Sequence, residues 1–195
     1  WINHGFQELV VLVNILVNDN QDVAIKSCGF NIVADIIEFC GPDSYLYKDL
    51  FQNTLKINLA TDTNLQIKQL AIYIIGLCSQ YGGPAYNGYC LGSLTRLFYL
   101  STMPETSEIA VATVSNICSN AEGEELIEWL KTEVPKTIKI LILAAYNRSI
   151  IAQNAKRLVQ CLKILLGKLG NEAAVEMIQT YPVETQTQIE KLFNT

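Results

Sequence analysis

The sequence is short of the residues from which most active sites are built. It contains a single histidine, His4, among 195 residues, so a serine or cysteine nucleophile would have no other imidazole to act as its base. Charged residues make up only 17% of the chain. These shortages argue against an enzyme, and the sequence offers no candidate catalytic residue.

Long uninterrupted apolar runs are also missing, although half of the residues are hydrophobic. Charged or amide side chains interrupt every apolar stretch before it reaches the ~20 residues needed to cross a bilayer. We therefore expect no membrane insertion. The chain starts at Trp1 without an initiator methionine or a signal-peptide pattern, which indicates a piece of a longer protein.

No two of the six cysteines form a Cys-x-x-Cys pair. Four of them, Cys40, Cys78, Cys118 and Cys161, recur at long and similar intervals, each near the end of an apolar stretch. Zinc sites and disulfide frameworks need closer clusters. We expect buried thiols in a reducing compartment, the cytosol or the nucleus, and neither a metal nor a cofactor.

The overall charge is negative, with a formal net charge of −5 and a pI near 4.9. This balance argues against direct binding of nucleic acid. An acidic surface suits a basic partner, although surface charge also serves solubility alone.

Apolar residues recur at helical spacing along nearly the whole chain. Between residues 65 and 81 they predict an amphipathic helix with a broad buried face, through Ile67, Ala71, Ile74 and Cys78. The same pattern predicts four pairs of helices, with Pro135 kinking or splitting the last first helix. The first helices are expected at 2–17, 44–60, 85–101 and 124–145, and the second helices at 21–40, 65–81, 107–121 and 149–169.

The sequence shows two predicted helices in every ~42 residues and no sustained alternation of apolar and polar residues, which strands would show. This pattern indicates an all-α fold. The period predicts a HEAT-like α-solenoid that forms a single domain of antiparallel pairs. The predicted repeats are 1–41, 42–83, 84–122 and 123–170, followed by a helical cap at 171–195 that Pro182 interrupts.

The stretch "CSQYGGPAYNGYC" raises the question of a phosphate-binding loop. A Walker-type loop needs a lysine and a hydroxyl residue after its last glycine, whereas Pro84 and Ala85 follow here. Gly82 or Gly83 can instead end a helix in the left-handed conformation, and Pro84 suits the first position of the next helix. Gly41 and Pro42 repeat this arrangement one repeat earlier, so both steps are predicted to be structural joints.

Three charged clusters have a structural and a functional interpretation. The glutamates before Trp129 favour the positive end of a helix dipole, with paired-carboxylate catalysis as the functional alternative. Trp129 is typical of a core or inter-repeat residue, with a ligand anchor as the alternative. The basic group on the last pair is expected to be a solvated face, with an acidic surface of the chain or a partner as the alternative contact. The glutamates are Glu122, Glu124, Glu125 and Glu128, and the basic residues are Arg148, Lys156, Arg157, Lys163 and Lys168.

Six further acids lie on predicted second helices or on the turns that lead into them. Because second helices line the concave side of a HEAT solenoid, these acids form a candidate surface for basic segments, bound through many weak and salt-sensitive contacts. They are Asp19, Asp22, Asp35, Glu38, Glu105 and Glu108.

Asp62 and Lys68 form a further candidate structural pair. An aspartate at this turn could cap the second helix, and the lysine could reach an acid on a neighbouring pair. Asp19 or Asp22 with Lys26 repeats the pattern, while the third and fourth pairs lack the base.

The string "IIEFCGPDSYLYKDLFQNTLKINLATDTNLQIKQLAIYIIGLCSQYGGPAYNGYC" resembles the distal repeats of importin-beta-type nuclear transport receptors. The similarity is greatest to the importin-five branch, also called karyopherin-beta-three, in which a Cys-Gly-Pro step, an acid before a base, and a "QYGG–Y" joint occur in this order. The end of the chain, with "AQNAKRLVQCLKILL" and "QTQIEKLFNT", is also similar to the end of such receptors.

The resemblance implies the C-terminal part of a nuclear import receptor. Such a receptor carries protein cargo with basic segments, grips phenylalanine-glycine repeats of nucleoporins, and shuttles between cytoplasm and nucleus. The Ran GTPase, which releases cargo, would bind mainly toward the N-terminal half. The alternative is a HEAT-repeat scaffold of another assembly, such as a vesicle coat, a phosphatase or kinase regulatory subunit, or a microtubule-binding subunit.

Overall fold

A computed structural model describes residues 2–17, 22–60, 63–147 and 150–193. In these ranges the regular structure is helical throughout, which confirms the predicted all-α class. None of the described helices combines the length and hydropathy that a bilayer crossing requires. The chain forms two compact units, residues 1–86 and residues 87–195.

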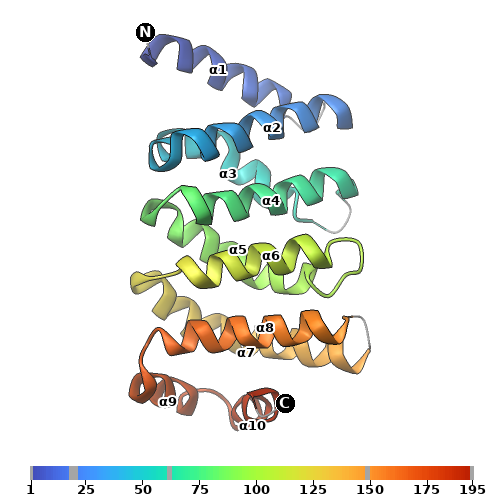
Figure 1. Cartoon of the computed structure of the whole chain (residues 1–195), viewed down its shortest axis with the longest axis vertical. Coiled ribbons are helices and arrows are strands. Elements are labelled where there is room, and N and C mark those ends of the chain that lie inside the picture. The colour runs from blue at the N-terminus through green and yellow to red at the C-terminus, as the bar shows by residue number, and fades with distance from the viewer. Residues whose placement is uncertain (1, 18–21, 61–62, 148–149, 194–195) are drawn as a thin grey trace. The chain divides into compact units, whose positions relative to one another are not determined.

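The described residues of the first unit form four α-helices and two short 3-10 helices (Figure 1). The helix expected at 44–60 is preceded by a 3-10 helix that begins at Gly41, and the chain becomes α-helical only at Lys48. The elements are α1 (Ile2–Leu16), α2 (Val23–Cys40), η1 (Gly41–Tyr47), α3 (Lys48–Ile57), α4 (Leu65–Tyr81) and η2 (Pro84–Tyr86).

The second unit contains the remaining six helices. The stretch expected to be interrupted at Pro182 forms two short helices that meet near that residue. The elements are α5 (Asn87–Leu100), α6 (Ser107–Asn120), α7 (Gly123–Tyr146), α8 (Ala152–Gly167), α9 (Asn171–Gln179) and α10 (Val183–Phe193).

Within each unit, helices of the same kind pack side by side. The second helices α2 and α4 lie against each other in the first unit, as α6 and α8 do in the second (Figure 1). The first helices α5 and α7 also pack together, and α5 packs on α6 within its own pair. This two-layer arrangement of paired helices is that of an α-solenoid.

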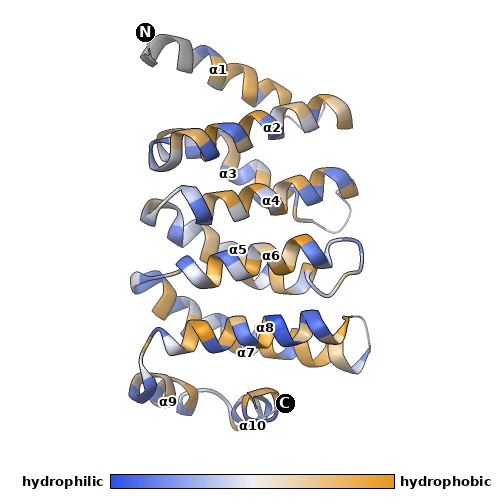
Figure 2. Cartoon of the chain, in the orientation of Figure 1, coloured by the Kyte–Doolittle hydropathy of each residue, from blue (hydrophilic) through white to orange (hydrophobic). Residues whose placement is uncertain are grey.

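Apolar side chains fill the space between the two layers of each unit. Figure 2 shows hydrophobic and hydrophilic segments alternating along the helices, as helical periodicity requires. Each fully buried aliphatic or aromatic side chain contributes about 1.5–3 kcal/mol by leaving water. Those with no exposed surface include Phe30, Ile37, Leu55, Ile72, Ile74 and Ile75 in the first unit, and Leu94, Leu97, Phe98, Val114, Leu130 and Leu162 in the second.

The Gly82-Gly83-Pro84 joint connects α4 to η2 through one left-handed residue. Gly83 has a φ of +70°, whereas Gly82 keeps a helical φ of −76°. A Cβ at Gly83 would also lie 3.4 Å from Cγ of Pro42. Gly41 has a φ of +54°, so the two glycine-proline steps share this backbone feature.

Gly82 is needed for a different reason, which is the close approach of Tyr86. A Cβ at Gly82 would lie 2.2 Å from Cδ2 of the Tyr86 ring, well inside van der Waals contact. Tyr86 is fully buried, its hydroxyl lies 3.0 Å from the Ser44 hydroxyl, and its ring stacks on Phe51. The joint therefore forms part of the core of the first unit, and this accounts for its glycines without any ligand.

Helix α7 runs unbroken through Pro135, so of the two outcomes expected there, a kink or a split, the split does not occur. Proline removes the amide that would donate to the carbonyl of Lys131. One residue before that carbonyl, Leu130 O accepts a hydrogen bond of 2.6 Å from the hydroxyl of Tyr181. Burial raises the pKa of Tyr181 to about 12.

We predict that Gly83→Val lowers the stability of the chain by about 1–2 kcal/mol, because valine must adopt a left-handed backbone. Urea unfolding followed by circular dichroism measures the change. Gly167→Ala is the matched control, because a Cβ there meets nothing within 4 Å, and its stability should be unchanged or raised. A normal urea midpoint for Gly83→Val would contradict the structural role of this glycine.

Replacing Tyr181 with phenylalanine should cost about 1 kcal/mol, the worth of its hydrogen bond to Leu130. Because folding raises the pKa of Tyr181 above its usual value near 10, its stabilising contribution is complete below pH ~10 and is lost as the pH rises toward ~12. Between pH 9 and 11 the natural chain should therefore lose about 1 kcal/mol more stability than Tyr181→Phe. Equal alkaline losses, measured by urea unfolding at each pH, would refute this role.

Candidate protein-binding surfaces

The acids hypothesised to meet a basic partner occupy two kinds of position in the first unit. Asp22 is the N-cap of α2, where its carboxylate accepts a hydrogen bond of 2.9 Å from the amide of Ile25. Asp35 and Glu38 are both exposed and lie three residues apart, so they are neighbours on the surface of α2. Asp19 lies outside the described residues.

In the second unit, Glu105 and Glu108 are exposed where the chain enters α6. Glu108 lies in the first turn of that helix, where a negative charge interacts favourably with the helix dipole. Glu105 also borders a groove of about 480 Å³ whose apolar walls include Tyr99, Met103 and Leu143. Each unit thus presents its own pair of exposed carboxylates.

The lysines of the hypothesised acid–base pattern are both buried. Lys26 is 8% exposed and Lys68 is 6% exposed, at equivalent positions of α2 and α4. Asp62 lies outside the described residues, and the N-cap of α4 is Asn64, whose side chain accepts from the amide of Gln66 at 3.0 Å. The capping role expected of Asp62 therefore belongs to Asn64.

All six cysteines are free thiols, but they are not uniformly buried. Cys28 is exposed and Cys40 is half-buried, which corrects the expectation for these two. In the described part of the chain, no three histidine, cysteine or acidic side chains gather in a way that could hold a metal ion. The buried thiols are Cys78, Cys90, Cys118 and Cys161.

Cys118 on α6 and Cys161 on α8 contact each other across the two second helices. The hydrogen bond from Cys118 lowers the pKa of Cys161 to about 7, with help from the Ser115 hydroxyl 3.5 Å away. Burial raises the pKa of Cys118 well above its usual value. Cys161 is therefore the thiol of this pair that ionises first.

Two members of the basic group make contacts within the second unit. Lys168 donates to the carbonyls of Ser119 and Ala121, both at 2.7 Å, and so neutralises the C-terminal end of α6. Lys163 donates to the Phe193 carbonyl at 2.9 Å and lies over its ring. Lys168 is nevertheless exposed and Lys163 is half-buried, so both keep part of the solvated face expected for them, and the partners they contact are carbonyls. Lys156 and Arg157 are exposed, and Arg148 lies outside the described residues.

The glutamates near Trp129 do not cap α7 through their side chains. Glu122 occupies the N-cap position without a side-chain hydrogen bond. Asn87 of α5 holds this turn instead, because its amide donates to the Glu122 carbonyl and its oxygen accepts from the Glu122 amide at 3.3 Å. Asn87 also lies 3.5 Å from a carboxylate oxygen of Glu125.

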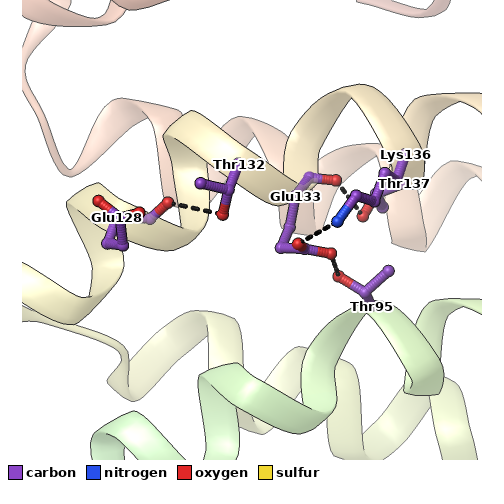
Figure 3. Close-up of polar contacts among 6 residues, drawn as sticks. All are labelled: Thr95, Glu128, Thr132, Glu133, Lys136 and Thr137. Atoms are coloured by element: carbon purple, nitrogen blue, oxygen red, sulfur yellow. Dashed lines mark hydrogen bonds and ion pairs between the residues drawn. The ribbon is translucent and has the colours of Figure 1, made fainter.

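A groove of about 420 Å³ lies between α5 and α7. Glu133, on its wall, accepts a hydrogen bond of 3.0 Å from the Thr95 hydroxyl and forms an ion pair with Lys136 (Figure 3). The indole of Trp129 is 4% exposed and stacks on Phe98. The lining residues are Gly88, Leu91, Gly92 and Thr95 of α5, with Glu125, Glu128, Trp129, Thr132 and Glu133 of α7.

Sequence reasoning missed this groove, although one signal was available. Gly88 and Gly92 lie one turn apart on α5, so they remove two side chains from the same face of the helix. The glutamates of α7 face that gap only because α5 and α7 pack side by side. The neighbour of a first helix is another first helix some 35 residues along the chain, and a local pattern does not identify it.

No protein-family model matches the sequence. Importin subunit beta-3 of Saccharomyces cerevisiae (strain ATCC 204508 / S288c) is 21% identical to the chain over 228 residues. The alignment covers 93% of this chain and 21% of the yeast protein. The chain thus spans about a fifth of the length of the curated relative that it matches.

Solved structures of a karyopherin have a similar fold. Kap121p bound to the SUMO protease Ulp1p matches with a TM-score of 0.52 and 19% sequence identity, over 96% of this chain and 21% of that one. A mutant of Kap121p matches with a TM-score of 0.52 and 18% identity, over 95% of this chain and 21% of that one.

The chain therefore has the fold of a helical-repeat α-solenoid, as the period of its sequence predicted. Within that class the chain is karyopherin-like, and the resemblance to the importin-beta family that its glycine-proline joints indicated is confirmed.

We predict that Lys168→Met lowers the stability of the chain by about 1 kcal/mol, because two carbonyls at the end of α6 lose a charged donor. Thermal melting followed by circular dichroism provides the measurement. Lys156→Met removes the same charge from an exposed position of α8 and should change stability by less than about 0.5 kcal/mol. If both variants melt at the same temperature, the contact of Lys168 contributes nothing.

Proposed function

We propose that the chain is the C-terminal part of a nuclear import receptor. In this role it binds protein cargo and nucleoporins, and the full-length protein releases cargo when Ran binds in its GTP form. The main support is the similarity to importin subunit beta-3, which extends over 93% of the chain and is accompanied by a karyopherin-like fold. The neighbouring Kap121p is itself bound to another protein, Ulp1p.

Stacked helix pairs suit a carrier for a physical reason. Each pair contacts only its neighbours, so small rotations between successive pairs add up to a large change of shape. We propose the repeats 1–41, 42–83, 84–122 and 123–170 as the units of that motion, with 171–195 as the cap. A receptor of this kind shuttles between cytoplasm and nucleus.

The experiment uses the full-length protein immobilised with a bound cargo that carries a basic segment. Addition of Ran locked in its GTP form should release the cargo, whereas Ran in its GDP form should not. Retention of cargo in both cases would contradict the proposal and favour a scaffold in another assembly. Binding to immobilised phenylalanine-glycine repeats tests the nucleoporin part separately.

The exposed acids supply the proposed surface for basic cargo. Replacing both Asp35 and Glu38 by their amides should weaken binding of an arginine-rich peptide about fivefold at low salt, since exposed charge pairs contribute up to about 1 kcal/mol. The same is expected for Glu105→Gln with Glu108→Gln, and both differences should shrink as salt rises. Fluorescence anisotropy of a labelled peptide gives the affinities.

The matched control changes the same amount of charge elsewhere. Glu172 and Glu176 are exposed on α9, and replacing both by glutamine should leave the affinity unchanged. An equal loss of affinity in all three variants would mean that net charge, and no particular surface, attracts the peptide.

A further inference from the structure

The groove between α5 and α7 has acidic side chains on its α7 wall and two glycines on its α5 wall. Three of its lining residues are glutamates, Glu125, Glu128 and Glu133, and none is basic. On the α5 side, Gly88 and Gly92 have no side chains. A Cβ at Gly88 would already lie 3.6 Å from Cγ of Glu125, so glycine keeps this end of the groove wide.

The three carboxylates differ in the hydrogen bonds and ion pairs that they form with the rest of the chain. Glu133 is held by the Thr95 hydroxyl and by Lys136 (Figure 3). Glu125 is exposed, and among the described residues its carboxylate accepts one long hydrogen bond, of 3.5 Å, from the side-chain amide of Asn87. The carboxylate of exposed Glu128 forms no hydrogen bond or ion pair with any residue that the structure describes; the contact it makes to Thr132 is through its backbone carbonyl.

Trp129 gives a second and independent indication of a ligand. Trp129 is one of the residues that line the same groove and is 4% exposed, and its indole nitrogen Nε1 is covered and has no acceptor among the described residues. Buried donors are nearly always paired, because leaving one unpaired is costly. Arginine and lysine side chains contain only donors, so neither of them could supply an acceptor for this N–H.

We propose that this groove binds an extended basic segment of a partner protein. An arginine or lysine side chain of the segment lies against the carboxylates of Glu125 and Glu128. A backbone carbonyl of the same segment accepts a hydrogen bond from Nε1 of Trp129. The glycines of α5 provide the room in which a peptide backbone approaches the helix.

The geometry favours a peptide over other cations. Three carboxylates repel a phosphate backbone, and the described acids do not gather as a metal site. A polyamine would satisfy the carboxylates but has no acceptor for the indole. Because Nε1 is covered in the unliganded chain, the side chains over it must shift on binding, which changes the surroundings of the indole. The proposal does not depend on a role in nuclear transport.

The test uses Trp129 as its own reporter. The chain has two tryptophans, so Trp1→Phe leaves Trp129 as the only one. A short capped peptide of alternating glycine and arginine should change its fluorescence in a saturable manner. A peptide with glutamine in place of arginine should not, and spermine, which has no carbonyl, should bind about tenfold more weakly than the arginine peptide.

Two variants separate the carboxylates from the indole. Glu125→Gln with Glu128→Gln should weaken binding of the arginine peptide about tenfold, while Glu172→Gln with Glu176→Gln, the same change of charge, should not. Trp129→Phe keeps a ring against Phe98 but removes the N–H, and should weaken binding of a labelled peptide about fivefold by anisotropy. Circular dichroism establishes that each variant is folded.

Three results would overturn the proposal. Equal weakening by the groove pair and the α9 pair would show a response to net charge alone. Unchanged Trp129 fluorescence at saturating peptide would place the peptide elsewhere, including on Asp35 and Glu38. Spermine binding as tightly as the peptide, together with unchanged binding by Trp129→Phe, would remove the carbonyl contact.

Discussion

The structure depends on the burial of apolar surface between successive helix pairs. Helix α4 has fully buried side chains on more than one face, including Ile67, Ile72 and Ile75. A single partner helix covers one stripe of a helix, so α4 needs both α3 of its own pair and α2 of the preceding pair. For the same reason α6 packs against both α5 and α8. Since the pairs of one unit complete each other's core, an isolated pair would leave apolar surface in water.

Side chains from one pair also satisfy backbone groups at the helix ends of another. The last carbonyls of a helix and its first amides have no partners within the helix. In the second unit Lys168 of α8 donates to carbonyls at the end of α6, and Asn87 of α5 holds the turn before α7. Tyr181 reaches the carbonyl of Leu130 inside α7. These bonds are directional, so they add to the specificity of the packing between pairs.

In this architecture the interior is filled by packed side chains, and charged side chains lie mainly on the surface. The space between the helix layers is used for packing, and exposed carboxylates such as Asp35 and Glu38 lie on the outside of helices.

The amino-acid sequence determined the helices, because helical periodicity and capping are local. It placed α2, α4, α6 and α8 within a few residues of their observed ends, and it excluded a phosphate loop at Gly82 and Gly83. It failed where the outcome depends on a distant neighbour. Only the tertiary structure decided that Pro135 lies within one continuous helix, that Lys168 meets carbonyls, and that Glu128 and Trp129 face a groove. Those contacts join residues from different pairs, and the packing of pairs is set by the summed fit of many side chains.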